Sequence, residues 1–310
     1  EADRVMEQAV TDGAQVIFAT APPLIGACRK VVARHPNVKV LVCSLDMSYA
    51  GLRTYYSRIY ESKFITGAIA GAMAREDTIG YIANYPIFGV PAGINAFALG
   101  AQMVNPNAKI LLHWSCTAGD PGDLFEKRGV TVISNRESPS PEQAAAGWGW
   151  GLSLFTPERQ EIPLAAPCWN WGTFYEKVIH GIFQGTWDSA KESGTAVNYW
   201  WGLSSGVIDV QLGQDLPEGV ARMARLLKQA IASGALDPFA CKIFDQDGQM
   251  RCDGKAPLTP EEIVKMDWLC QGVEGSIPGF EELLPMSRSM VGLLGLYRDS
   301  IPPETEGALL

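Results

Sequence analysis

The stretch that decides the fold runs from residue 78 to residue 114 and reads "TIGYIANYPIFGVPAGINAFALGAQMVNPNAKILLHW". Its two ends, residues 78–85 and 109–114, are short runs of apolar and β-branched residues, which are typical of strands buried on both faces of a parallel sheet. The segment between them is rich in small residues and predicts a helix that packs closely on that sheet. The stretch therefore predicts a strand, a helix and a second strand that form one β-α-β unit.

Similar runs recur along the first half of the chain. Residues 16–20, 39–45 and 130–135 predict three more strands, and helical stretches lie between them at residues 22–36 and 61–77. In the second of these helices, Gly67 and Gly71 stand four residues apart, a spacing that lets a helix approach a neighbour closely. Strict alternation of strand and helix predicts right-handed units and a doubly wound α/β sheet.

After residue 150 the pattern changes. A helix is expected from about Thr173 to Phe183, an amphipathic helix within residues 217–238, and a hairpin around Asp247 and Gly248. The segments 136–146 and 154–167 are expected to be irregular. Because only 30 residues, 117–146, separate "HWSC" from "GWGWG", we expect one helix of this region to be very short or replaced by a loop.

Composition limits the kinds of partner. A chain of 310 residues with 47% hydrophobic content can bury a large core and suits two domains. A net charge of -9 and a pI of about 5.0 argue against nucleic acid or an anionic membrane surface and favour a small molecule or a protein. No apolar run approaches the length of a membrane span. The chain opens at Glu1 with what reads as a helix already under way, so we expect a fragment or a processed form.

The sequence offers no convincing catalytic or metal-binding set. It contains no glycine-rich nucleotide loop and no nucleophile elbow. His113 and Cys116 are the one histidine and thiol close together, but nothing supplies a third group to orient them, and a thiol hydrolase would need a depressed pKa at Cys116. Asp245, Asp247 and Gly248 only partly match a calcium loop. We therefore predict no cofactor, no metal and no enzyme activity.

The cysteines bear on the compartment. All seven are widely scattered and their number is odd, which excludes a complete set of disulfides. Buried reduced thiols are the expected state, and these favour a reducing compartment such as the cytoplasm.

Aromatic residues gather where predicted strands end. Tyr85 and Phe88 follow one strand, while tryptophan pairs stand in "GWGWG" (147–151), "CWNWG" (168–172) and "NYWWG" (198–202). Ligands of doubly wound proteins bind beyond the carboxyl ends of the strands, so such residues can form walls for a flat ligand. The alternative, that these rings only fill the seam between two lobes, stays open.

Four blocks carry a family resemblance: "RIYESKFITGAIAGAMA" (58–74), "IGYIANYPIFGVPAGINAFALGAQMVNPNAKI" (79–110), "WNWGTFYEKVIHGIFQGTW" (169–187) and a stretch from "IFDQDGQMRCDG" to "GVEGSIP" (243–278). In this order they resemble the basic membrane protein (BMP) family, the PnrA-like substrate-binding proteins of ABC transporters. Within the stretch quoted first, residues 85–114 are similar to the first β-α-β unit of the second lobe of this family.

The resemblance implies a type I periplasmic-binding-protein fold, with two doubly wound α/β lobes and a hinge, and with the amino-terminal part of the first lobe missing. The lobes are expected at residues 1–76 and 77–168, followed by a crossover helix, hinge and additions to both lobes at 169–280 and a tail at 281–310. It also implies a protein without enzyme activity that binds a purine base or nucleoside in the inter-lobe cleft, passes it to a permease and is a lipoprotein of the plasma membrane.

Two departures from the family pattern modify that expectation. Where nucleoside-binding relatives show Gly-aromatic-Asp, this chain has Gly147-Trp148-Gly149, so the expected ribose anchor is absent. A basic residue of some relatives is replaced by Trp169. A planar purine-like base is therefore expected before an intact nucleoside. The alternative function is an intracellular ligand-sensing or regulatory domain of the same fold, whose ligand shifts an equilibrium between open and closed lobes.

The predicted ligand-binding residues come from strand ends in both halves. Thr20 and Pro22 follow a first-lobe strand, while Tyr85 and Phe88 form a lip of the cleft. Hydrogen bonds are expected from polar side chains and stacking from two tryptophans. These residues are Thr20, Asn135 and Arg136 for the hydrogen bonds, and Trp148 and Trp169 for the walls.

Overall fold

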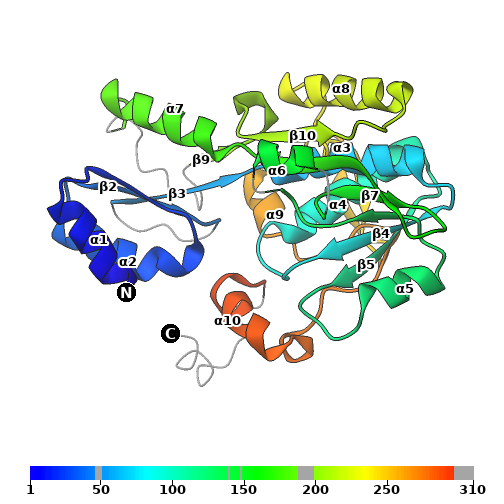
Figure 1. Ribbon diagram of the computed structural model, residues 1–310, viewed down its shortest axis with the longest axis horizontal. Helices are drawn as coiled ribbons and strands as arrows, with labels where there is room; N and C mark the ends of the chain where they lie inside the picture. The colour runs from blue at the N-terminus through cyan, green and yellow to red at the C-terminus, as the bar shows by residue number, and fades with distance from the viewer. Residues whose placement is uncertain (46–50, 139, 147–148, 188–198, 297–310) are drawn as a thin grey trace. The chain divides into compact units, whose positions relative to one another are not determined.

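The computed structural model describes residues 1–45, 51–138, 140–146, 149–187 and 199–296 (Figure 1). The chain divides into two compact units: unit 1 comprises Glu1–Ser57 and Lys177–Trp201, and unit 2 comprises Arg58–Glu176 and Gly202–Leu310. The lobe boundaries predicted from the sequence at residues 76, 168 and 280 stay predictions.

Unit 1 contains a parallel sheet in the order β1-β2-β3-β9. Its strands are β1 (Val16–Ala19), β2 (Lys39–Cys43), β3 (Leu52–Ser57) and β9 (Tyr199–Trp201). The centre of β2, residues 40–42, is fully buried, as its continuous apolar run predicts. Helices α1 (Ala2–Thr11) and α2 (Ile25–Arg34) pack side by side, and the short η1 (Pro22–Leu24) leads directly into α2 (Figure 1).

Arg53 ties the late segment of unit 1 to its early strands. The guanidinium of Arg53, on β3, donates to the hydroxyl of Tyr199 at 2.7 Å and to the backbone carbonyl of Trp187. It also lies 3.9 Å from the centroid of the Trp187 ring, an arrangement that favours a cation. Tyr199 in β9 and Trp187 are therefore held to this sheet although more than 130 residues separate them from Arg53.

Unit 2 is built on a seven-stranded sheet in the order β10-β8-β7-β6-β4-β5-β13. Strands β6, β4, β5 and β13 are parallel, whereas β7 and β10 run antiparallel to their neighbours. The parallel part matches the predicted β-α-β pattern, and the antiparallel part was not predicted. The strands are β4 (Thr78–Ala83), β5 (Lys109–Trp114), β6 (Val132–Ser134), β7 (Leu152–Phe155), β8 (Glu161–Trp169), β10 (Ile208–Leu212) and β13 (Val273–Glu274).

The two faces of this sheet take different helices. On β4, Tyr81 points to α3 (Ile59–Met73) and α4 (Val90–Val104), with its ring 5.0 Å from that of Phe97. Its neighbour Ile82 points the other way and packs with Phe125 of α5 (Pro121–Lys127), as the two-residue period of a strand requires. The remaining elements are α6 (Pro141–Ala146), α7 (Trp171–Phe183), η2 (Leu203–Ser205), α8 (Glu218–Ala232), β11 (Lys242–Phe244), β12 (Met250–Asp253), α9 (Pro260–Val264), η3 (Phe280–Glu282) and α10 (Pro285–Leu294).

Helices α3 and α4 approach each other as closely as the predicted glycine spacing suggests. A Cβ atom built on Gly67 would lie only 2.8 Å from the carbonyl carbon of Phe97, and one built on Gly100 only 2.9 Å from that of Phe64. Gly71 faces Ala101 in the same way, because a Cβ atom built on Gly71 would lie 3.1 Å from Cα of Ala101. The two backbones are therefore in direct contact along this seam, which only glycine permits.

Two segments expected to be irregular are regular in part. Residues 154–167 contain most of the β7–β8 pair, and residues 136–146 contain the short helix α6. The prolines Pro163 and Pro167 argued against strands, but both lie in β8 within paired register. The region between β5 and β7 holds α5, β6 and α6, so both of its helices are short. The predicted hairpin at Asp247 and Gly248 is confirmed by β11 and β12.

Candidate functional site

The carboxyl ends of several strands of unit 2 meet at one edge of its sheet. Strands β4, β6 and β8 point in the same direction, because β7 runs antiparallel to both β6 and β8. We call the place where these strands end the carboxyl edge. Ligands of open α/β sheets bind outside such an edge. Of the predicted site residues, Asn135 and Arg136 follow β6, Trp169 ends β8, and Tyr85 and Phe88 follow β4.

Backbone hydrogen bonds hold the segment after β6 against the two strands beside it. We call this segment, residues 135–138, the β6 loop. The amide of Asn135 donates to the carbonyl of Gly151 at 2.6 Å, and the amide of Gly151 donates to the carbonyl of Arg136 at 2.8 Å. Further along, the amide of Trp169 donates to the carbonyl of Ser138 at 3.2 Å. The loop thus brings Asn135, Arg136 and Trp169 into one backbone network.

Gly151 makes this network possible. It adopts a φ of 67°, in the left-handed region that favours glycine. A Cβ atom at this position would also lie 2.5 Å from Cα of Ala166 on β8. The residue before it, Trp150, precedes β7 at the carboxyl edge and packs against Ala166 and Cys168.

Two aromatic groups line this part of the carboxyl edge. The guanidinium carbon of the exposed Arg136 lies 4.4 Å from the centroid of the Trp150 ring. Trp169 stacks on Trp171, with centroids 6.3 Å apart and planes 12° from parallel, and Trp171 stacks on Tyr175 in turn at 6.5 Å and 21°. The edge therefore combines a cation held over one ring with a row of nearly parallel rings.

Sequence reasoning missed part of this arrangement. Trp150 was noted only as the neighbour of Trp148, and Trp148 itself lies outside the described residues. A usable signal was Gly151, since a glycine just before a strand often permits close backbone approach. Trp171 and Tyr175 are four residues apart on α7, a spacing that places them on one helix face.

The side chain of Asn135 is held by the backbone amide of the next residue. Its Oδ1 accepts a hydrogen bond from the amide of Arg136 at 2.8 Å. This bond orients the carboxamide so that Nδ2, a donor, is turned away from that amide. Asn135 and Arg136, which follow β6 at the carboxyl edge, both carry side-chain N–H donors.

Tyr85 and Phe88 are bound to a different part of unit 2. The amide of Phe88 donates to the carbonyl of Leu294 at 3.2 Å, and Ile87 pairs with Gly295. The next amide, of Gly89, donates to the carbonyl of Val264 at 3.0 Å. The ends of α9 and α10 therefore fix this segment, which leads into the first turn of α4.

Thr20 and Pro22 lie in unit 1. Thr20 follows the carboxyl end of β1 and is exposed, and Pro22 is the first residue of η1. The structure thus places each of these two at the strand end where the sequence predicted it, and their part in binding a ligand stays a prediction.

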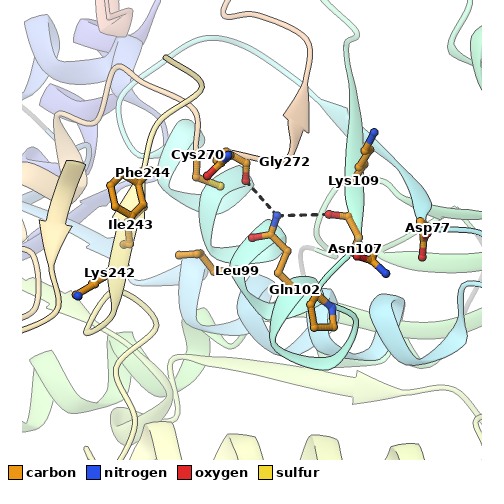
Figure 2. Close-up of a pocket in the computed structure, with 13 residues that line it drawn as sticks. Asp77, Leu99, Gln102, Asn107, Lys109, Lys242, Ile243, Phe244, Cys270 and Gly272 are labelled. Carbon is orange, nitrogen blue, oxygen red and sulfur yellow. Dashed lines mark hydrogen bonds between the residues drawn. The ribbon is translucent and has the colours of Figure 1, made fainter. Parts of the chain in front are cut away.

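A hollow of unit 2 lies at the other edge of the sheet. Its volume is about 810 Å³, and it opens to solvent beside the starts of β4, β5 and β13. Figure 2 shows Ile243 and Phe244 on one side of this amino-edge hollow and Asp77 and Lys109 on the other, with Gln102 between them. Gln102 Nε2 donates to the carbonyls of Ala108 at 3.4 Å and Gln271 at 3.0 Å. None of the predicted site residues that the structure describes lines it.

The thiol chemistry considered from the sequence lacks its main requirement. Burial raises the pKa of Cys116 to about 11, the opposite of an activated nucleophile. Burial also lowers the pKa of His113. All seven cysteines are free thiols. Within the described part of the chain, no cluster of histidine, cysteine and carboxylate side chains is suited to a metal ion, and no helix has the length and hydropathy to cross a membrane.

Comparison with known proteins adds sequence relatives. Two relatives are each 27% identical to this chain, and each alignment covers 90% of this chain. One is named a purine-binding protein of Brucella abortus, aligned over 292 residues and 81% of its length. The other, from Haloferax volcanii, is provisionally named an ABC transporter glucose-binding protein and is aligned over 295 residues and 70% of its length.

Solved structures show the fold. The chain resembles a transcriptional activator of the comK gene from Bacillus halodurans, with a TM-score of 0.60, 16% identity and coverage of 76% of this chain and 85% of that one. It also resembles an ABC transporter solute-binding protein from Conexibacter woesei, with a TM-score of 0.53, 14% identity and coverage of 76% of this chain and 83% of that one. A third similar structure is an ABC transporter solute-binding protein from Aeropyrum pernix, with a TM-score of 0.51, 13% identity and coverage of 76% of this chain and 80% of that one. The predicted α/β class, with the fold of periplasmic solute-binding proteins, is confirmed.

A family model matches the first part of the chain. Residues 2–123 fit the family described as ABC transporter substrate-binding protein PnrA-like. This match covers the first two of the four sequence blocks that carried the resemblance, and the purine-binding relative spans all four. The resemblance predicted from the sequence, to the PnrA-like substrate-binding proteins of ABC transporters, is therefore confirmed.

Proposed function

We propose that this chain is the solute-binding component of an ABC transporter and that its ligand is a planar molecule of the purine class, bound at the carboxyl edge. The observation that carries the ligand class is the pairing of flat rings with N–H donors at this edge. Trp169, Trp171 and Tyr175 form a row of nearly parallel rings, and Asn135 and Arg136 offer donors beside it. A purine base presents both a flat face and ring or carbonyl acceptors.

The two relatives point to different ligands by name. The Brucella abortus protein is named for purine and the Haloferax volcanii protein for glucose. A purine stacks π face to π face on an aromatic ring, whereas a sugar ring can offer such a ring only its C–H groups, so the row of nearly parallel rings favours the purine. The position where nucleoside-binding relatives hold ribose with a carboxylate is occupied by Gly149 in this sequence. A free base is therefore the proposed ligand, ahead of its riboside.

The test is a thermal-shift screen with adenine, guanine, hypoxanthine, xanthine, their ribosides and glucose. A ligand at 100 times its dissociation constant adds about 2.7 kcal/mol to the free energy of unfolding, which is readily detected. Stabilisation by bases and not by ribosides supports the proposal. Stabilisation by glucose alone, or by no compound from folded protein, contradicts it.

Two variants locate the site. Trp169→Ala should weaken binding of the active base by about 1 to 3 kcal/mol, the usual value of a base stacked on an aromatic ring. Phe244→Ala is the matched control, because it removes an aromatic ring at the amino-edge hollow. A loss of affinity in Phe244→Ala with none in Trp169→Ala would move the site to the amino edge.

The family further implies a location outside the cytoplasm and delivery of the ligand to a permease. We propose this location together with a lipid anchor supplied by the full-length protein. Protease accessibility of the protein in intact and in permeabilised cells checks it. Protection in intact spheroplasts would instead favour an intracellular sensing domain with the same binding edge.

A further inference from the structure

One lysine of unit 2 is buried inside the apolar helix α3. Lys63 is 1% exposed and stands among small and apolar residues that are buried with it. A buried ammonium is costly unless it is paired and hydrogen-bonded. Its partners therefore indicate what it holds in place.

Two of those partners belong to the β6 loop. Lys63 Nζ lies 3.0 Å from Oε1 of Glu137 and donates to the backbone carbonyl of Asn135 at 3.2 Å. The third partner is Tyr81 on β4, whose ring centroid lies 5.0 Å from Nζ. The Glu137 side chain is itself largely buried, with 19% exposed. A single cation thus fastens the β6 loop to the helix behind it.

The lysine remains charged in this setting. Burial acts to lower the pKa of Lys63, but the nearby carboxylate of Glu137 and the hydroxyl of Tyr81 outweigh it, and the pKa is raised. Glu137 and Tyr81 are the titratable groups facing the ammonium. The attachment therefore persists across the physiological pH range.

The arrangement also determines what the loop presents. The carbonyl of Asn135 and the carboxylate of Glu137 are both turned to Lys63, while Arg136 between them is exposed and lies over Trp150. The donor side chains of Asn135 and Arg136 depend on this backbone geometry. Loss of the ammonium would leave a buried carboxylate and a buried carbonyl without their donor and would release the loop.

We propose that Lys63 is a positioning residue for ligand recognition, which sets the β6 loop so that Asn135 and Arg136 present their donors at the carboxyl edge. This inference rests on the proposed function, since Asn135 and Arg136 are its proposed ligand contacts. Lys63 itself does not touch the ligand. No sequence pattern indicated this role, because Lys63 and Glu137 are 74 positions apart in the chain.

The first experiment compares ligand binding by Lys63→Met, Glu137→Gln and the double variant, using the base that binds the wild type. Lys109→Met is the matched control, because Lys109 is a half-exposed lysine of the same unit paired with Glu274. Lys63→Met should weaken binding by roughly 10- to 100-fold in folded protein, and Lys109→Met by less than about 2-fold. The double variant should bind as weakly as Lys63→Met alone, because both substitutions break one attachment.

A pH series separates positioning from a general loss of stability. In Glu137→Gln the ammonium loses its paired charge and gives up its proton at lower pH, so the affinity of this variant should fall at alkaline pH while that of the wild type stays level. Wild-type affinity in Lys63→Met, or a level profile in Glu137→Gln, would overturn the proposal.

Amide hydrogen exchange without ligand tests the loop directly. In Lys63→Met the amides of Asn135 and Ser138 should exchange roughly tenfold faster, whereas those of the α3–α4 seam should not change. Equal rates in wild type and variant would overturn the inference even if a ligand binds. If the ligand panel is silent but the exchange rates differ, the proposed function fails and the positioning of the loop by Lys63 stands.

Discussion

The seam between α3 and α4 allows a graded test of how tightly unit 2 is packed. Carbon atoms in contact normally lie about 3.5 Å or more apart, so the 2.8 Å between a Cβ at Gly67 and the carbonyl carbon of Phe97 requires the helices to separate by at least about 0.7 Å, and the carbonyl oxygen of Phe97, which is nearer still, requires more. The obstacle is backbone, which cannot rotate away as a side chain can. Gly67→Ala should therefore destabilise unit 2 although alanine favours a helix by about 1 kcal/mol.

The expected loss of stability is the cost of the backbone clash minus the gain in helix propensity. Overpacking a well-filled core costs about 1 to 3 kcal/mol and sometimes more, and a backbone clash belongs at the upper end. After the gain in helix propensity, we expect a net loss of about 2 kcal/mol for Gly67→Ala and Gly100→Ala. Gly71→Ala, whose Cβ would lie 3.1 Å from Cα of Ala101, should lose less. Gly93→Ala is the control, because its nearest atoms are 3.8 Å away in ordinary contact.

Urea unfolding followed by circular dichroism measures the series. With a slope of about 2 kcal/mol per molar, a loss of 2 kcal/mol lowers the unfolding midpoint by about 1 M. The midpoint of Gly93→Ala should stay level or rise. If Gly67→Ala unfolds at the wild-type midpoint while Gly93→Ala is also unchanged, the helices are not in backbone contact and the reasoning fails.

Three further predictions concern single side chains. The pKa of the buried Glu61 is raised, chiefly by desolvation, so the wild type loses stability as pH rises from the ordinary pKa of 4.5 through the raised pKa of the folded protein. Glu61→Gln, which can still accept from the amide of Leu203, should gain stability relative to wild type in urea unfolding as pH rises above 4.5, and a constant difference would contradict this. Thr259→Ala removes the capping box of α9 and should cost about 1 kcal/mol in thermal unfolding, whereas Thr259→Ser should cost only a few tenths. In alkylation of the native protein followed by mass spectrometry, the exposed Cys241 should react first and Cys116, with a pKa of about 11, only on unfolding; equal rates would refute the burial of Cys116.

Local sequence patterns predicted the elements that depend on burial alone. The strands at 78–83 and 109–114 are continuous apolar runs, and the helix between them is confirmed because its small residues meet α3 without a gap. The strand β8 could not be predicted in this way. Pro163 and Pro167 lack an amide donor and suggested an irregular segment, yet β8 lies between two strands and the carbonyl of Pro167 still accepts from Ser138 at 2.8 Å.

The sequence predicted which site residues lie at strand ends, but it did not predict the contacts among them. Asn135, Arg136 and Trp169 follow or end neighbouring strands, so their common edge could be expected from the fold. The contacts among them could not, because the loop that joins them depends on the conformation of Gly151 and on the burial of Lys63. Both are properties of packing between segments far apart in the chain.

The bonds between residues 87–89 and the far end of the chain set the order in which unit 2 can fold during synthesis. The segment that leads into α4 is held by the carbonyls of Val264 and Leu294, and β5 pairs with β13. A ribosome must therefore make about 160 to 190 more residues after α4 before these partners exist, and contacts of such long range slow folding. Until then the nascent unit exposes an unpaired edge of β5, which is open to pairing with the wrong strand.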